Sequence, residues 1–151
     1  MPKFEIKRFH ENHGHEGLGY DCDLYMDGVL VCHSNNEGGG GCDLHHWASK
    51  EMREKMLAYI ATLPPHHWDE SDLHLEDQPM DMDLFMMNLI CEFQTNKTFK
   101  RQCKTKTLFT LKSDKRDEYH IHKQAYSPAI VAGLRKHYGD QLVEIINERF
   151  Q

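Results

Sequence analysis

The fold is decided by the stretch Tyr20-Asp-Cys-Asp-Leu-Tyr-Met-Asp-Gly-Val-Leu-Val-Cys-His33. Alternating runs lie on both sides of Asp27-Gly28, and an Asp-Gly pair in this setting is typical of a type I′ β-hairpin. If residues 27 and 28 form the turn, the pairing across the hairpin is fixed. The predicted pairs on one face are Met26 with Val29, Leu24 with Val31, and Cys22 with His33. Most of these residues are apolar, so this face is expected to pack on the core.

Other elements are predicted on both sides of the hairpin from apolar spacing, serine caps, and proline or glycine stops. They are a short strand around Phe4 and Ile6, a loop over 10–17, a glycine-containing loop over 33–47, a helix from Ser49 to Pro64, a helix from about Asp81, strands over 105–112 and 118–123, a helix from Ser127 to Gly139, and a strand over 142–146. The chain of 151 residues is long enough for a sizeable core. We therefore expect a single α+β domain over residues 1–151, with an antiparallel sheet of about five or six short strands and three helices.

Charge is divided unevenly along the chain. Residues 1–96 carry 18 Asp and Glu against 6 Lys and Arg, a net charge of −12, whereas residues 97–151 carry 6 acids against 12 bases, a net charge of +6. Such a chain either closes on itself electrostatically or offers two faces of opposite sign to partners. The overall charge of −6 argues against a dedicated nucleic-acid binder. The basic stretch over 97–106 is therefore interpreted as a solvated helix end that pairs with the acidic segment over 69–83.

Composition also limits the cellular setting. No apolar run approaches the roughly 20 residues of a membrane helix, and residues 1–5 lack the apolar stretch of a signal peptide. The five cysteines are odd in number and widely spaced, with no CxxC pair, which does not fit a disulfide framework. We therefore expect a cytoplasmic protein with no membrane association.

One candidate metal site is predicted near the hairpin. Its ligands would be Cys22, His33, Cys42 and His45. The predicted register brings Cys22 opposite His33, and the other two residues would fold back after the glycine loop. A structural or catalytic zinc ion takes about four such ligands. The alternative is that Cys22 is a small buried apolar residue and His33 lies half in water, in which case no cofactor is bound.

A second candidate is a ligand site at the glycine run. The run consists of Gly38, Gly39, Gly40 and Gly41. Its backbone N–H groups could bind a phosphate or nucleotide, and Trp47 is placed to stack on such a ligand. However, no GxxxxGK[ST] or GxGxxG motif is present, and Glu37 and Asp43 flank the run and would repel an anion. The alternative is a flexible connection.

The segment over 69–83 is strongly acidic. Its candidate partner-binding residues are Asp69, Glu70, Asp72, Glu76 and Asp77. Closely spaced carboxylates can imitate the phosphates of a nucleic acid and occupy a basic groove on a partner. The alternatives are a solubilising loop or a divalent-cation site, although the EF-hand pattern is missing. No Ser-His-Asp or Cys-His arrangement follows from the spacing, so no catalytic residue is predicted.

Two segments resemble a group of small proteins of unknown function from bacteria and their phages. They are the segment from Ser127 to Arg149 and the segment Tyr25-Met-Asp-Gly28 with the glycine run behind it. The resemblance implies no activity and no functional residues. It implies only that the chain binds a host component, as small phage proteins often do.

The charge pattern and the resemblance favour a small non-enzymatic binding protein, encoded by a phage, that docks on a larger host protein and modulates or inhibits it. Its acidic surface would speed association, and apolar side chains would supply affinity. The alternative is a nucleotide-binding or small-ligand-binding protein, or a metal-dependent enzyme, that uses the 33–47 loop. A homodimer or a component of a larger particle is a third hypothesis.

Overall fold

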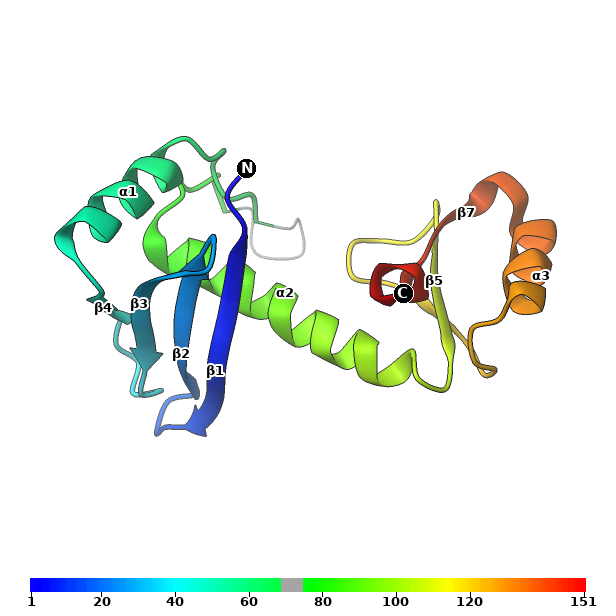
Figure 1. Ribbon diagram of the computed structural model, residues 1–151, viewed down its shortest axis with the longest axis horizontal. Helices are drawn as coiled ribbons and strands as arrows, with labels where there is room; N and C mark the ends of the chain where they lie inside the picture. Colours follow the sequence, from blue (N-terminus) through cyan, green and yellow to red (C-terminus); the bar gives the residue numbers. More distant parts are fainter. Residues whose placement is uncertain (69–74) are drawn as a thin grey trace. The chain divides into compact units, whose positions relative to one another are not determined.

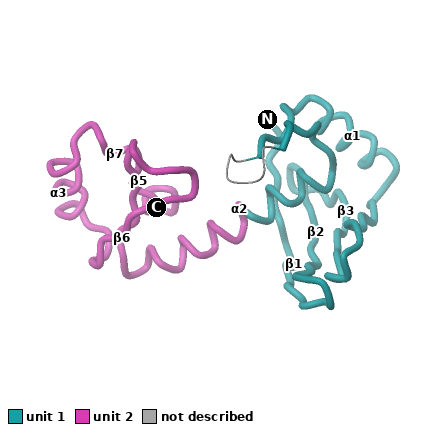
Figure 2. Tube along the Cα trace, turned by 180° about the vertical axis from the view of Figure 1, so that it is seen from behind, with its two compact units in different colours: residues 1–91 teal, residues 92–151 magenta. Residues whose placement is uncertain are grey.

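The computed structural model describes residues 1–68 and 75–151. The chain forms two compact units, residues 1–91 and 92–151 (Figure 2). The division of charge follows this boundary closely: residues 1–91 carry 17 Asp and Glu against 6 Lys and Arg, and residues 92–151 carry 7 against 12. Each unit has its own antiparallel sheet. The acidic and basic parts of the chain therefore correspond to different folded units.

In the first unit, four strands form an antiparallel sheet with the order β1-β2-β3-β4, and two helices pack on one face of it (Figure 1). The elements are β1 (Phe4–His13), β2 (Leu18–Met26), β3 (Val29–Asn36), β4 (Leu44–Trp47), α1 (Lys50–Ala61) and the first half of α2 (Met82–Gln102). Alternation along β2 buries Cys22, Leu24 and Met26 on the helix-covered face. The facing side chains of the helices are Met56, Ile60, Met82, Phe85, Met86 and Ile90.

The second unit has a three-stranded antiparallel sheet with the order β6-β5-β7. Its elements are the rest of α2, β5 (Thr107–Leu111), β6 (His120–His122), α3 (Pro128–Tyr138), the 3₁₀ helix η1 (Gly139–Gln141), β7 (Leu142–Ile145) and the 3₁₀ helix η2 (Ile146–Phe150). Successive residues of β5 belong to two small cores. Phe109 packs against α3, whereas Leu108 packs against Phe99 of α2 and against Ile146. Both faces of this sheet are therefore covered.

Several local predictions are confirmed. Asp27 and Gly28 have φ values of 50° and 80°, the left-handed conformation that both positions of a type I′ turn need. Ser49 and Ser127 cap α1 and α3 by accepting a hydrogen bond from the backbone N–H three residues later. Gly139, with φ 52°, ends α3. These features depend on neighbouring residues, so the sequence is sufficient to predict them.

The predicted hairpin register is wrong beyond the turn. Val31 has no partner in β2 and forms a β-bulge, so the pairing shifts by one residue. The observed pairs are Met26 with Val29, Leu24 with Cys32, and Cys22 with Ser34. A shift of one residue moves every following side chain to the other face of the sheet. His33 therefore leaves the face that carries Cys22 and lies opposite Asp23.

The α+β class is confirmed, but the single sheet of about five or six strands is not. The described residues form two sheets of four and three strands. The predicted 33–47 loop contains β4, and β1 continues through the first part of the predicted 10–17 loop. Both segments are polar strands that owe their structure to pairing with a neighbour, which single-sequence patterns do not reveal. Among the described helices, none is long and apolar enough to cross a membrane.

Candidate functional site

Two carboxylates and one imidazole lie together where the start of β4 approaches the start of α2. Asp43 and His45 are two residues apart along extended chain, which directs their side chains to the same side, and Asp83 comes from the first turn of α2. One ligand atom from each of the three lies within 4.8 Å of the others. His45 Nε2 is 2.7 Å from Asp83 Oδ1. We call Asp43, His45 and Asp83 the Asp–His–Asp cluster.

Polar groups of β2 and β3 orient the two sheet-borne members of the cluster. The fully buried Ser34 hydroxyl lies 2.8 Å from Nδ1 of His45. The Tyr20 hydroxyl donates to Oδ2 of Asp43 at 2.7 Å, and the Asn36 amide donates to Oδ1 of Asp43 at 2.8 Å. Burial, reinforced by the hydrogen bond to Asp43, raises the pKa of Tyr20, so its hydroxyl stays protonated and remains a donor. Such outer hydrogen bonds fix the direction in which His45 and Asp43 can bind.

The cluster borders a pocket of about 500 Å³ in the first unit, which we call the acidic pocket. Its apolar wall is formed by Leu18, Trp68, Leu84, Met87 and Ile90. Its acidic residues are Asp43, Asp81 and Asp83. Among the described residues that line it, none is a lysine or an arginine. The pocket thus suits a ligand that joins a positive charge to an apolar body.

Of the four predicted metal ligands, only His45 belongs to the cluster that the described residues form. Cys22 pairs with Ser34, which pairs with His45, so Cys22 and His45 are two strand spacings, about 10 Å, apart. Burial raises the pKa of the Cys22 thiol to about 12, which opposes the thiolate that zinc requires. Cys42 is exposed, and His33 lies on the other face of the sheet. The structure does not bring these four side chains together.

His33 instead joins an ionic network on the face of the sheet that the helices leave open. Its Nδ1 is 2.8 Å from Asp23 Oδ1, and its Nε2 is 3.0 Å from Asp21 Oδ2. Asp23 is 1% exposed and also accepts a hydrogen bond from Arg8 Nε at 2.6 Å. The hydrogen bond to Asp23 raises the pKa of His33. Burial alone would raise the pKa of Asp23, but the hydrogen bonds from His33 and Arg8 outweigh it and lower that pKa.

The glycine run is tied to neighbouring backbone and side chains. Gly38 N–H donates to Asn36 Oδ1 at 2.8 Å, and the Gly38 carbonyl accepts the N–H of Glu16 at 3.0 Å. Asn36 also donates to the Gly41 carbonyl at 3.1 Å. Trp47, predicted to stack on a ligand at this run, packs against the core of the first unit. Ligand binding by the run stays a prediction.

The predicted partner-binding carboxylates fall into two groups. Asp69, Glu70 and Asp72 lie outside the described residues. Glu76 and Asp77 are exposed, and Asp77 Oδ1 is 2.6 Å from His67 Nδ1. Docking through this segment therefore stays a prediction, for which Glu76 and Asp77 are the described positions that can be tested.

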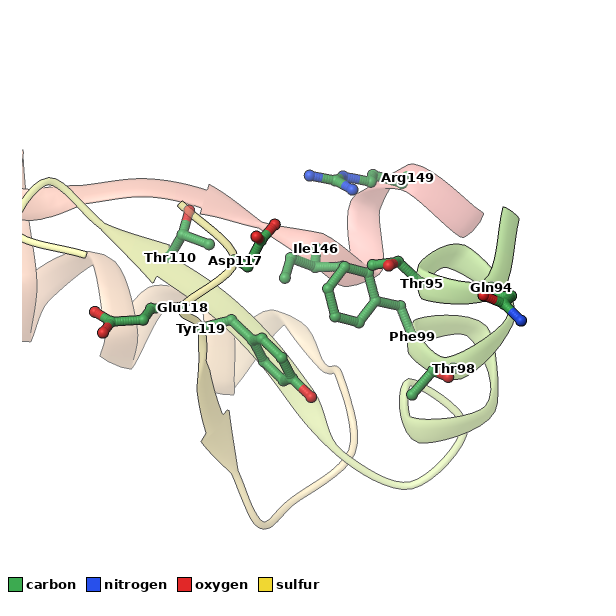
Figure 3. Close-up of a pocket in the computed structure, with 10 residues that line it drawn as sticks. All are labelled: Gln94, Thr95, Thr98, Phe99, Thr110, Asp117, Glu118, Tyr119, Ile146 and Arg149. Atoms are coloured by element: carbon green, nitrogen blue, oxygen red, sulfur yellow. The ribbon is translucent and has the colours of Figure 1, made fainter. Parts of the chain in front are cut away.

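The second unit holds another pocket, of about 490 Å³ (Figure 3). The rings of Phe99 and Tyr119 line it edge to face, with centroids 4.9 Å apart, and Ile146 adds to this apolar wall. Its basic residue, Arg149, donates to Glu144 at 2.7 Å. Because this guanidinium already has a carboxylate partner, the pocket is a weaker candidate for an anion than its position in the basic unit would indicate.

Comparison with known proteins assigns no family. No family model, no curated protein and no solved structure matches the chain. The function is therefore inferred from the geometry and charge of the molecule itself.

The sequence pattern does not identify Asp43 and Asp83 as members of one site. It assigns Asp83 to a helix N-terminus and Asp43 to the flank of a loop, and each assignment is correct locally. Residues 43–47 read Asp-Leu-His-His-Trp, which does not alternate between polar and apolar, so no local signal marks this segment as a strand. That this strand end meets the start of α2, 38 residues further on, is a tertiary contact that no local pattern contains.

Proposed function

We propose that the chain is a small non-enzymatic binding protein that docks on a larger protein through its acidic first unit and modulates or inhibits that protein. The observation that carries the proposal is the net charge of −11 over residues 1–91, gathered in one compact unit. A surface of one sign speeds the encounter with a basic partner and disfavours acidic ones. The resemblance to small phage proteins makes a host protein the expected partner.

Reversing exposed charge in the acidic segment is expected to weaken docking. The double variant Glu76→Lys/Asp77→Lys should lower the association rate for the partner by about tenfold, because it replaces two attractive charges by two repulsive ones. Both residues are exposed, so folding should be little affected. The measurement is a pull-down from host lysate, followed by surface plasmon resonance with the captured partner at low and high salt.

The matched control is Glu51→Lys/Glu54→Lys, which makes the same charge change on exposed positions of α1. It should weaken docking less than the change at Glu76 and Asp77. Equal loss in both variants would assign the effect to net charge and contradict docking through this segment. A lysate that yields no stoichiometric partner would contradict the proposal as a whole.

The Asp–His–Asp cluster favours a second candidate function, in which the chain binds a divalent metal ion as a metal-dependent enzyme or ligand-binding protein. Two carboxylates and one imidazole suit Zn²⁺ or Mn²⁺. The ligand atoms lie within 4.8 Å of one another, which is close enough for small side-chain movements to let them share an ion. Ser34 and Tyr20 would then supply outer hydrogen bonds to the ligands.

If the cluster binds metal, Zn²⁺ added to chelator-treated protein should bind with a strength that depends on His45. The variant His45→Ala is expected to lose affinity by at least about tenfold in isothermal titration calorimetry. The adjacent His46 is exposed and pairs with His33, away from the cluster, so His46→Ala should bind Zn²⁺ like the unchanged protein. Equal affinities of the two variants would exclude a metal centre at the cluster.

A further inference from the structure

We propose that the acidic pocket receives an arginine side chain of the protein partner, one that is flanked by apolar residues. This inference rests on the docking function proposed above and names the chemistry by which the partner is recognised. It follows from three properties of the pocket: its charge, its hydrogen-bond acceptors and its apolar wall.

The negative charge of the pocket favours a cationic ligand. Asp43, Asp81 and Asp83 line it, and the described lining residues include no lysine or arginine; the His45 imidazole, 2.7 Å from Asp83, lies behind the wall. Tyr20 experiences the resulting negative potential, because the charges of Asp43 and Asp83 add to burial and to its hydrogen bond in raising its pKa. Asp83 and Asp81 lie at the N-terminal end of α2, toward which the backbone N–H groups of the first turn point. An anionic ligand would be repelled from such a site.

The acceptors of the pocket suit a group with several donors. Each carboxylate oxygen can accept about two hydrogen bonds, so Asp43 keeps acceptor capacity while Tyr20 and Asn36 donate to it. Asp81 Oδ1 accepts the N–H of Leu84 at 2.8 Å, which holds this carboxylate at the start of α2. Carboxylates from two separate parts of the chain therefore converge on one space. A guanidinium has five N–H donors in a planar fork and can reach more than one of them.

The apolar wall distinguishes an arginine side chain from a bare ion. Leu18 and Met87 are 67% and 38% exposed, so apolar surface next to the carboxylates is left uncovered. An arginine places its methylene stem against such surface while its head stays on the acids. Trp68 adds an indole ring, on which a guanidinium stacks better than an ammonium does. The pocket volume lies in the range of about 300–1,000 Å³ that organic groups occupy.

The experiment uses the ¹⁵N-labelled full chain and a pair of capped tripeptides, acetyl-Leu-Arg-Leu-amide and the same peptide with citrulline. Citrulline has nearly the shape of arginine without its charge. Titration by NMR should shift the Trp68 indole and Met87 amide signals with the arginine peptide. The citrulline peptide should bind at least about tenfold more weakly, because it lacks the charge-assisted hydrogen bonds.

Variants locate the binding. Asp83→Asn should weaken the arginine peptide by about tenfold, because it removes one carboxylate of the pocket. Glu54→Gln, which removes an exposed carboxylate of the same unit on α1, should leave the affinity within about twofold, as expected for a surface charge that does not line the pocket. Backbone amide spectra of both variants that overlay on the wild-type spectrum away from the changed residue would show that the fold is kept.

Three results would overturn the inference: equal binding of the two peptides, an Asp83→Asn variant that binds the arginine peptide as well as the wild type, or Zn²⁺ that shifts the pocket signals where the arginine peptide does not. The last result would make the site a metal centre. None of these results would contradict docking driven by charge. That function is tested separately, by the binding of the Glu76→Lys/Asp77→Lys variant to the captured partner. Conversely, peptide binding without any cellular partner would contradict the docking function alone.

Discussion

The variant Asn147→Ala is expected to lower the free energy of unfolding of the second unit by about 3–4 kcal/mol. Asn147 is 1% exposed, in η2. Its Oδ1 accepts the N–H of Leu108 at 2.8 Å, and its Nδ2 donates to the Lys106 carbonyl at 2.8 Å. Alanine leaves the buried Leu108 N–H and the partly buried Lys106 carbonyl without these partners, and an unpaired buried group costs about 1–3 kcal/mol. A domain is stable by only about 5–15 kcal/mol, so the loss is a large part of the total.

Urea unfolding followed by far-UV circular dichroism measures this loss, and hydrogen exchange of the Leu108 amide assigns it to the broken contact. Both tryptophans, Trp47 and Trp68, belong to the first unit, so their fluorescence separates its transition from that of the second. The control is Gln141→Ala, an exposed side chain of the second unit, which should change stability by less than about 0.5 kcal/mol. An unchanged Leu108 exchange rate in Asn147→Ala would contradict the expectation.

The first unit is expected to lose stability as the pH rises above about 6.5 and through the raised pKa of His33, because His33 loses its proton. The folded state raises the pKa of His33 above its unfolded value of about 6.5. The stabilisation that protonated His33 gives the folded state is therefore complete below the unfolded pKa and is lost as the pH rises through the folded pKa. The pKa of Asp23 is lowered, so its contribution is present above about pH 4 and is lost as the pH falls through the folded pKa. The network stabilises most between these limits.

Removing the buried carboxylate of Asp23 should lower the free energy of unfolding more than removing the imidazole of His33. Asp23→Asn is expected to cost about 2 kcal/mol near pH 6, less than a fully buried ion pair because Arg8 and His33 are partly hydrated. His33→Gln should flatten the loss of stability with rising pH. Urea unfolding followed by tryptophan fluorescence at several pH values measures both. The control His13→Gln, exposed at the end of β1 and paired with Leu18, should keep the slope. If the stability of His33→Gln still fell with rising pH as steeply as that of the wild type, the role of this side chain would be contradicted.

The elements that the sequence predicts correctly are those with local causes. Asp27-Gly28 forms the expected turn because both residues tolerate a positive φ, and Ser127 caps α3 because its side chain reaches the free N–H groups of its own helix. The apolar stripe of α2 likewise depends on spacing within one helix. The change of sign in the charge, expected at residue 96, lies close to the boundary of the two units at residue 91.

The parts that could not be predicted depend on contacts between distant segments. The bulge at Val31 shifts the pairing of β2 with β3 by one residue. The turn fixes only the pairs next to it, so it does not determine whether such a shift follows. That choice moves His33 from the predicted metal site to the network with Asp23. The Asp–His–Asp cluster needs β4 to meet α2, so spacing in the sequence could supply only His45 of its three members.

The contact between the 14–17 turn and the glycine run bears on the thermodynamics of any association at the acidic pocket. A Cβ on Gly14 would approach the Gly38 carbonyl oxygen to 2.3 Å, so the two backbones touch, and Asn36, which lines the pocket, holds the run at both ends. Folding has therefore already removed the conformational entropy of this segment. A ligand that enters next to it meets a preorganised rim and loses less free energy to ordering than four consecutive glycines would imply.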